Sequence, residues 1–319
     1  MQKTNLTAIT TIHLLGFQDT YRVTFLVFFL FFVVYLVTIF GNLLIITLVS
    51  YSRNLHTPMY FFLTQLSVSD ILLATDILPN MLHAVVVKDN MISFTDCIAQ
   101  FYFFDVSETT DCLLLTVMCY DRYLAICQPL HYTYIVNHQF CHRMVMVTWM
   151  TSACVVLIHT LTITKLNFCG PNIIDHFFCD LDPILQLSCS DITVVEIEVT
   201  MLSSLLVVIP FFIILISYVY IIFTILQIPS ITGRQKAFST CSSHLAVVSM
   251  YYGTLLCVYL VPNRNLSWNI SKYLSLLYTV VTPLMNPIVY SLRNKDLQSA
   301  VGKVFSDLYK IPRNQQWLM

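Results

Sequence analysis

Long apolar runs alternate with short polar connectors along almost the whole chain. Seven of these runs are each long enough for a helix to cross a bilayer, which takes about 20 residues. They cover residues 23–50, 58–86, 97–125, 144–164, 199–227, 237–261 and 273–292. Because the connectors leave no room for a separate soluble domain, the pattern predicts an all-α fold, a bundle of seven transmembrane helices.

An amphipathic pattern follows the seventh run. Lys295, Gln298 and Lys303 alternate there with apolar residues at helical spacing, which predicts a short helix lying on the inner leaflet. The apolar positions are Leu297, Val301, Val304, Phe305 and Leu308. The chain then divides into an extracellular tail at 1–22, a seven-helix domain at 23–292, and a cytoplasmic helix and tail at 293–319.

Composition agrees with a membrane protein. Residues are 57% hydrophobic and only 10% charged, and the mean hydropathy is +0.74. That leaves too little polar surface for a soluble protein of this size. The formal net charge of -1 suggests no nucleic-acid partner. The first residues lack the pattern of a removable signal peptide, so we expect the first run to act as an uncleaved anchor.

The distribution of charge predicts the orientation. Ten of the 16 Lys and Arg residues fall on the side of the C-terminus, which makes that side cytoplasmic. The glycosylation acceptors Asn5, Asn265 and Asn269 all fall on the opposite side. We therefore expect a multi-pass protein of the plasma membrane with its N-terminus outside.

Several polar residues lie within the apolar runs. Asn42, Asp70, Asp111 and Asn286 are placed at bilayer depth, where charges cost several kcal/mol and are usually functional. Together they could solvate a sodium ion. The alternative is a neutral cluster of protonated acids and amides that hydrogen-bond to one another.

The third run ends on Asp121, Arg122 and Tyr123. An acid beside an arginine at the cytoplasmic end of a membrane helix can form an ion pair that breaks on activation. Alternatively, Arg122 only reaches toward the lipid headgroups, as basic residues at helix ends commonly do.

Five blocks of sequence carry a family resemblance. They are His-Thr-Pro-Met-Tyr-Phe-Phe-Leu at 56–63, Met-Cys-Tyr-Asp-Arg-Tyr-Leu-Ala-Ile-Cys at 118–127, Ser-Cys-Ser-Asp at 188–191, and the segments 236–245 and 283–296. With these blocks the chain resembles olfactory receptors of the tetrapod-type class, which are rhodopsin-like G-protein-coupled receptors. The sixth run contains Tyr252-Gly253 and no proline, as in olfactory receptors, and Gly253 is a candidate soft point of that helix.

The resemblance also implies a disulfide pattern. Cys97, Cys169, Cys179 and Cys189 are expected on the oxidising outside, and four cysteines allow three pairings. The family resemblance implies Cys97 with Cys179 and Cys169 with Cys189. These bonds would hold the long second outer loop over the bundle.

Family members bind small volatile odorants between the outer halves of the third, fifth, sixth and seventh helices. The corresponding lining here is Phe101, Phe104, Asp105, Glu108, Thr109, Val207, Tyr252, Leu255, Leu256 and Tyr259. Such walls suit a small hydrophobic ligand. Alternatively, some of these residues only pack helix against helix.

Asp105, Glu108 and Asp111 form a ladder of acids at steps of three residues. This spacing predicts that all three lie along one side of a helix. The family more often has histidine at the position of Asp105 and glycine at that of Glu108. We interpret the two departures as favouring a cationic ligand such as an amine. The alternative is that proximity keeps them neutral, as hydrogen-bond donors.

The resemblance implies signalling through a heterotrimeric G protein of the stimulatory olfactory type, which raises cyclic AMP. A bound ligand would shift the equilibrium toward an open cytoplasmic end. The residues expected to carry coupling and activation are Asp121, Arg122, Tyr123, Lys236, Asn286, Pro287 and Tyr290.

Three other interpretations fit the sequence less well. His176, Cys179 and Asp180 resemble a metal site, but a disulfide would consume the Cys179 thiolate. Intramembrane acids also occur in transporters, although no matching halves or paired broken helices are apparent. Asp70 and Asp111 lack the Gly-x-Gly-Asp signature of an intramembrane aspartyl protease. We therefore expect a receptor without enzymatic activity and with no cofactor other than a possible structural sodium ion.

Overall fold

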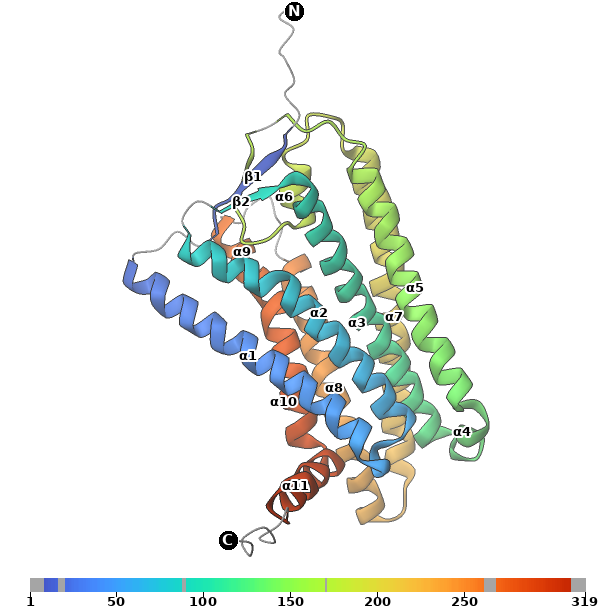
Figure 1. The fold of residues 1–319 in the computed structure, drawn as a ribbon. Helices are drawn as coiled ribbons and strands as arrows, with labels where there is room; N and C mark the ends of the chain where they lie inside the picture. The colour runs from blue at the N-terminus through green and yellow to red at the C-terminus, as the bar shows by residue number, and fades with distance from the viewer. Residues whose placement is uncertain (1–8, 17–20, 88–89, 170, 261–267, 311–319) are drawn as a thin grey trace, which may run out of the picture.

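The computed structural model describes residues 9–16, 21–87, 90–169, 171–260 and 268–310. Seven long helical segments run side by side, as Figure 1 shows. They are α1 (Tyr21–Tyr51), α2 (Pro58–Val86), α3 (Phe94–Cys127), α5 (His138–Ile163), α7 (Thr193–Gln227), α8 (Ile231–Leu260) and the joined segments α9 (Trp268–Leu276), η2 (Leu277–Val281) and α10 (Thr282–Arg293). The predicted seven-helix class is confirmed.

Five of these segments are long and apolar enough to cross a membrane by length and composition alone: α1, α2, α5, α7 and residues 272–292. The helices α3 and α8 carry more polar residues. The acids of α3 are tolerated because this helix packs against α2, α5 and α7 at once, so its polar side chains lie inside protein instead of facing lipid.

Two helix boundaries follow from capping residues. The Ser93 Oγ accepts a hydrogen bond from the Asp96 backbone N–H over 3.0 Å at the start of α3. The Asn137 Oδ1 accepts one from the Phe140 N–H over 2.9 Å at the start of α5. Each bond satisfies a backbone donor that the first helical turn leaves unpaired.

The seventh segment is interrupted where the hydropathy pattern predicts one continuous helix. The five residues of η2 form a π-helical turn between α9 and α10. The α8 helix, by contrast, is continuous through Gly253. Hydropathy does not reveal the change, because the Leu-Tyr-Thr-Val-Val sequence of η2 is as apolar as the helix on either side of it.

A small sheet covers the N-terminal end of the bundle, and the sequence pattern did not predict it. The strand β1 (Thr11–Leu14) lies between β2 (Met91–Ser93), to which it is antiparallel, and β3 (Ile173–Ile174), to which it is parallel. Ile12 and Leu14 of β1 are buried. A strand of four residues is too short to be recognised from the pattern of long apolar runs.

The Lys272 ammonium also holds the outer segments together. It donates a hydrogen bond to the Gly16 carbonyl over 3.0 Å and forms an ion pair with Asp175 of the loop between α5 and α7. The first part of the chain is therefore tied to the seventh helical segment.

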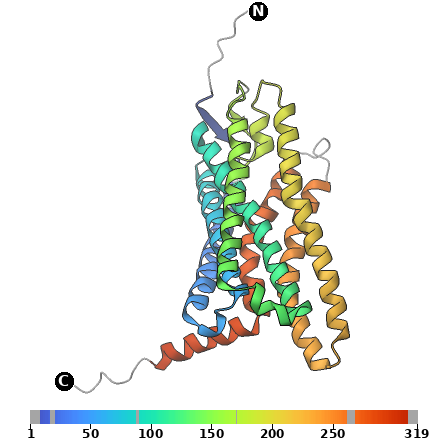
Figure 2. The same cartoon turned by 90° about the vertical axis from the view of Figure 1, so that its right-hand side faces the viewer.

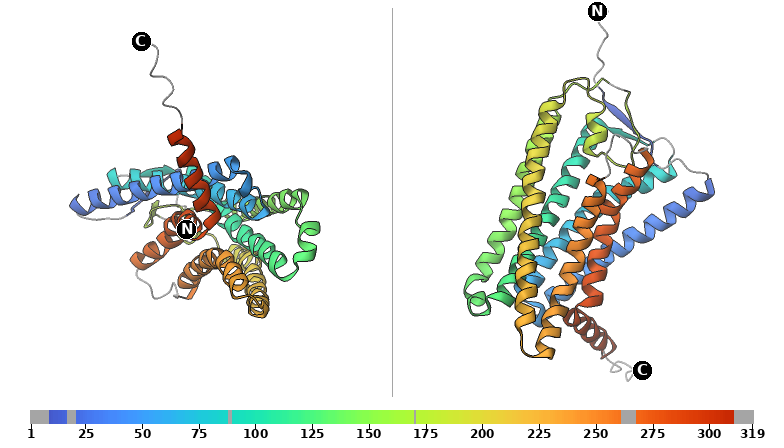
Figure 3. Two further views of the ribbon diagram at one scale, coloured as in Figure 1. Left: turned by 90° about the horizontal axis from the view of Figure 1, so that it is seen from below. Right: turned by 180° about the vertical axis from the view of Figure 1, so that it is seen from behind.

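The end of the bundle opposite the sheet carries three shorter elements: η1 (Arg53–Leu55), α4 (Pro129–Ile135) and α11 (Lys295–Lys310). Figure 2 shows α11 turning away from the bundle axis, and its Leu297 and Ala300 are buried. This is the predicted amphipathic helix, although the side chains of Phe305 and Leu308 lie outside the described residues. Figure 3 shows α1 diverging from the other helices toward its N-terminal end.

Candidate functional site

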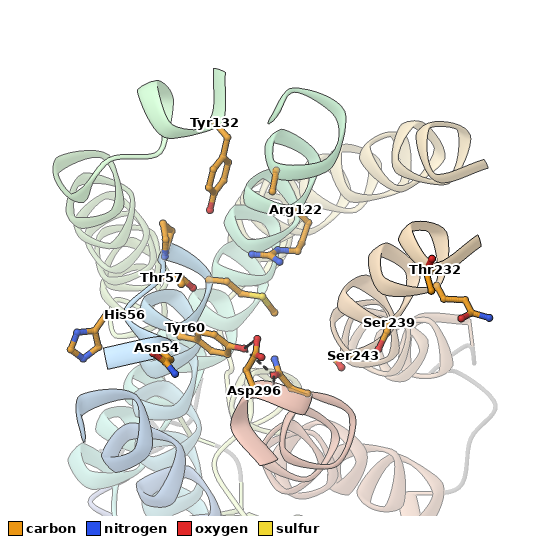
Figure 4. A pocket seen from close by; sticks show the side chains of 15 residues that line it. Asn54, His56, Thr57, Tyr60, Arg122, Tyr132, Thr232, Ser239, Ser243 and Asp296 are labelled. Atoms are coloured by element: carbon orange, nitrogen blue, oxygen red, sulfur yellow. Dashed lines mark hydrogen bonds between the residues drawn. The ribbon is translucent and has the colours of Figure 1, made fainter. Parts of the chain in front are cut away.

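A cavity of about 760 Å³ opens at the end of the bundle that carries α4 and the start of α11. Figure 4 shows Arg122 reaching into it from α3 and Tyr132 approaching from α4, with Ser239 and Ser243 of α8 opposite. The lining residues are Asn54, His56, Thr57, Pro58, Met59, Tyr60, Arg122, Ala125, Tyr132, Thr232, Gln235, Ser239, Ser243, Asn294 and Asp296. Most of them donate or accept hydrogen bonds, so the cavity suits a polar or charged polypeptide segment.

Arg122 is held at this cavity by an ion pair with its neighbour. The Asp121 Oδ2 accepts hydrogen bonds from the Arg122 Nε over 3.0 Å and from a terminal guanidinium nitrogen over 2.5 Å. The second oxygen of Asp121 accepts a hydrogen bond from the Tyr132 hydroxyl over 2.8 Å. Since Asp121 is 1% exposed, the pair is shielded from water and stronger than a surface ion pair.

Tyr132 was not among the predicted coupling residues. The sequence pointed to Tyr132 only through its position in the short loop after the third run. Hydropathy could not identify it as a partner of Asp121, because hydropathy does not show that α4 folds back toward α3. Burial of the Tyr132 phenol and the nearby Asp121 charge raise the pKa of this tyrosine well above its ordinary value. It therefore stays a hydrogen-bond donor at physiological pH.

Two further contacts join helices near the cavity. The Tyr60 hydroxyl of α2 donates hydrogen bonds to Asn294 over 2.9 Å and to Asp296 over 3.2 Å, which connects α2 to the start of α11. A hydrogen bond of 2.6 Å joins the Tyr218 hydroxyl of α7 to the His244 Nδ1 of α8. Sequence reasoning also missed these pairs, because their members are far apart along the chain.

The remaining predicted coupling residues are distributed around this end. Tyr290 is fully buried, and its hydroxyl has no hydrogen-bond partner among the described residues. Pro287 lies within α10 and packs close to Gly41 of α1. Tyr123 is half-buried against the apolar core, and the side chain of Lys236 lies outside the described residues.

The four polar residues predicted at mid-membrane are all buried. The Asn286 amide nitrogen donates hydrogen bonds to both oxygens of Asp70, over 2.9 and 3.1 Å. The Asn42 amide nitrogen donates to the Thr38 carbonyl over 3.1 Å. One side-chain oxygen each of Asn42, Asp111 and Asn286 has no partner among the described residues. Buried oxygens without donors are what a small hard cation requires.

The outer end is fixed by disulfides, in the pairing that the resemblance implies. Cys97 of α3 is joined to Cys179, and Cys169 to Cys189. The Cys179 backbone N–H also donates a hydrogen bond to the Gln100 side chain over 3.0 Å. The long second outer loop is thereby held against α3, and Cys179 has no thiolate to offer a metal.

Two titratable residues of this loop are buried. Burial and, to a lesser extent, the positive charge of Lys272 lower the pKa of His176 to about 4. Burial raises the pKa of Asp180 to about 6. The Asp180 carboxylate caps α6 (Leu181–Leu185) and accepts a hydrogen bond from the Tyr278 hydroxyl over 2.9 Å.

Several predicted ligand residues pack against other helices or loops, as the alternative interpretation anticipated. Phe104 contacts the rings of Phe178 and Tyr278, with centroids 5.0 and 6.0 Å apart. Phe101 belongs to the apolar cluster beneath the outer sheet. Tyr252 contacts Phe211, and its hydroxyl lies 3.3 Å from the Cys112 sulfur.

The other predicted ligand residues are less enclosed. Val207 and Leu255 are partly buried against the core cluster, and Thr109 is half-buried. The side chains of Leu256 and Tyr259 lie outside the described residues. So do Asn5, Asn265 and the side chain of Asn269.

The acid ladder does not keep to one side of α3. The Asp105 carboxylate lies 3.7 Å from the His159 Nδ1 of α5. The Glu108 backbone carbonyl accepts a hydrogen bond from the Tyr251 hydroxyl of α8 over 3.1 Å, and its Oε1 is buried without a partner among the described residues. A step of three residues turns a helix by 300°, so Asp105 and Asp111 point in directions about 120° apart. Glu108 and Asp111 each keep one carboxylate oxygen without a hydrogen-bond partner among the described residues.

Within the described part of the chain, no group of three or more His, Cys, Asp or Glu side chains converges on one point. His176, Cys179 and Asp180 do not form such a group.

A seven-helix bundle with an arginine ion pair at a cavity at one end and a disulfide-tethered loop at the other is the arrangement of a G-protein-coupled receptor. The family model described as olfactory receptor matches residues 31–308. The chain belongs to the olfactory receptor family.

Individual relatives agree with this assignment. The chain is 46% identical to human olfactory receptor 11L1 over 95% of its length and 94% of the relative's. It is 44% identical to mouse olfactory receptor 1M1 over 96% and 98% of the two chains, and 45% identical to rat olfactory receptor 1500 over 95% and 97%. The protein is thus a multi-pass membrane receptor for odorants that couples to a G protein, and not an enzyme.

Proposed function

We propose that this receptor activates a stimulatory, olfactory-type G protein and raises cyclic AMP when a small volatile ligand binds in the outer half of the bundle. The cavity that exposes Arg122 carries the proposal, because a G-protein α subunit needs such a polar opening. Both disulfides lie at the end of the bundle that carries β1, which supports an extracellular N-terminus in the plasma membrane.

The proposed activation begins with separation of Arg122 from Asp121. The cytoplasmic end of α8 near Lys236 then moves outward, which requires rearrangement of the Tyr218–His244 contact. Tyr290, whose hydroxyl has no partner among the described residues in this arrangement, would move toward the enlarged cavity and find one. A ligand drives the change only by binding the open arrangement more tightly.

The preferred ligand class is a small amine, and Glu108 is the residue proposed to bind it. Its Oε1 has no partner among the described residues, so a protonated amine would form a charge-assisted hydrogen bond there. Asp105 takes a lesser part because His159 already lies beside it. The competing interpretation is that Glu108 is protonated and donates a hydrogen bond to a neutral odorant.

A sodium ion is proposed at the buried cluster of Asp70, Asp111, Asn42 and Asn286. The support is that one oxygen each of Asn42, Asp111 and Asn286 has no hydrogen-bond partner in the part of the chain that the structure describes. Replacing sodium by choline should then lower the thermal stability of the purified receptor. The Asp111→Asn variant should lose this sodium dependence, whereas a neutral cluster predicts no dependence in either protein.

The decisive experiment measures cyclic AMP in cells that express this chain, exposed to amines beside matched alcohols and acids, with surface expression quantified. Wild type should respond to amines. Glu108→Gln should lose that response at equal surface expression, and Asp105→Asn should retain most of it. A response to neutral volatiles alone would refute the amine preference while leaving the receptor assignment intact.

A further inference from the structure

Two histidines face each other at the cytoplasmic start of α5. His138 and His142 are four residues apart, which places both rings on one face of the helix. Their Nε2 atoms are 3.2 Å apart, and both side chains are exposed. The proposed receptor mechanism makes no use of this pair.

The separation of the two nitrogens matches that of two ligands on one metal ion. Zn–N bonds are about 2.0–2.1 Å long, so two nitrogens on one tetrahedral zinc lie about 3.3 Å apart. We propose that His138 and His142 bind a Zn²⁺ ion through their Nε2 atoms. Because both rings are exposed, water molecules have room to complete the coordination.

Local packing already holds the two rings in this arrangement. Asn137 caps the first turn of α5, which fixes the backbone at His138. Phe61 of α2 packs its ring edge against His142, with centroids 4.8 Å apart. The imidazole rings of the histidines are themselves 4.3 Å apart. Because the two side chains are already ordered, metal binding costs little further conformational entropy.

The competing occupant of the space between the rings is a proton. Without metal, one neutral imidazole donates its Nε2–H to the Nε2 of the other. When zinc binds both Nε2 atoms, the donor ring gives up its Nε2 proton to water and takes one from water at Nδ1, so both rings stay neutral and no net proton is released. The positive end of the α5 dipole opposes a cation here. The site has only two protein ligands and is opposed by the helix dipole. It should therefore bind zinc more weakly than a four-ligand structural site, and reversibly.

Full-length receptor without a polyhistidine tag, purified in detergent, is titrated with zinc chloride against a zinc-sensitive dye. We expect one zinc ion per chain whose affinity depends on both histidines. Loss of an outer-shell partner weakens metal sites about 10–100-fold, so His138→Ala and His142→Ala should each weaken binding by at least that much. His131→Ala, at an exposed histidine of α4, should bind zinc as wild type does.

Alanine is favourable in an exposed helix, and His142→Gln provides a second variant that keeps a polar side chain. Circular dichroism verifies that each variant is folded. Zinc should raise the unfolding temperature of wild type and His131→Ala, and should leave His138→Ala and His142→Ala unchanged. Zinc binding that survives both alanine substitutions, or no binding by wild type at millimolar zinc, would overturn the proposal.

Discussion

The Tyr132 hydroxyl donates a hydrogen bond to Asp121 over 2.8 Å, on the carboxylate oxygen that Arg122 does not use. Asp121 therefore has two separate donors in this arrangement. In the proposed activation Arg122 leaves Asp121, and Tyr132 remains as the donor to this carboxylate among the described residues. The tyrosine consequently matters more to the open arrangement than to the closed one, because a buried carboxylate without a partner is costly.

Tyr132→Phe should therefore reduce signalling. A hydrogen bond to a charged group contributes about 1.5–3 kcal/mol. Losing it should destabilise the open arrangement more than the closed one by a part of that amount. A shift of about 1 kcal/mol changes the ratio of open to closed receptor roughly fivefold. Ligand-stimulated cyclic AMP should fall accordingly at equal surface expression. Tyr134→Phe is the control, since Tyr134 is 84% exposed; increased basal activity in Tyr132→Phe would contradict this account.

Asp121→Asn should have the opposite effect. Neutralising Asp121 removes the charge that holds Arg122, so the closed arrangement is destabilised more than the open one. Basal cyclic AMP should rise severalfold without ligand. Unchanged basal activity at normal surface expression would mean that Arg122 is held mainly by other groups.

The approach of α1 to α10 depends on the absence of a side chain at Gly41. A Cβ atom added there would lie 3.1 Å from the Pro287 Cβ, and the proline ring cannot rotate away. Gly41→Ala should destabilise the receptor by about 1–3 kcal/mol, as overpacked cores do. Gly302→Ala is the matched control, because nothing lies within 4 Å of its added Cβ. Equal unfolding temperatures of the two variants would refute the packing argument.

The Cys97–Cys179 disulfide closes a loop with a sequence separation of 82. Its removal by Cys97→Ser should cost about 2–4 kcal/mol and lower both the unfolding temperature and surface expression. The double variant Cys97→Ser, Cys179→Ser should be no worse than either single one. Cys154→Ser is the control, since Cys154 is a free, exposed cysteine. A comparable loss of stability and surface expression in Cys154→Ser would mean that any cysteine-to-serine substitution harms the receptor, and not the loss of the disulfide.

His176 and Asp180 should give opposite pH dependences of stability. The folded protein keeps a proton on Asp180 up to about pH 6, whereas the unfolded chain releases it near 3.8. Asp180 thus adds stability as the pH falls through 6. The unfolded chain protonates His176 below about 6.5, which the folded protein resists down to about 4. His176 therefore removes stability as the pH falls from 6.5 toward 4.

The two effects partly cancel in wild type, so variants are needed to separate them. Lowering the pH from 7 to 5 should destabilise Asp180→Asn by about 1–2 kcal/mol more than wild type, and His176→Phe should instead gain stability. Unfolding temperatures at the two pH values provide the measurement. Asp191→Asn should match the wild-type pH dependence, because hydrogen bonds from Thr193 lower the pKa of Asp191 below its ordinary value. Identical profiles in all four proteins would contradict the assignment.

The sequence by itself determined the membrane class, the seven spans, the amphipathic α11 and the family. These features depend on hydrophobic periodicity and on contiguous blocks of residues, both of which are local along the chain. It also located Asp121, Arg122 and the buried Asp70, because charges within or at the ends of apolar runs are conspicuous.

Only the tertiary structure decided which groups meet. Tyr132 and Asp121, Tyr218 and His244, and the strand β1 with its two partners come from separate segments, and no local pattern encodes their approach. The same holds for the acid ladder, since only the neighbouring helices decide that Asp105 lies beside His159 of α5 and Glu108 beside Tyr251 of α8. Hydropathy fixes which segments are buried in the membrane, whereas packing fixes the partners of the polar side chains they carry.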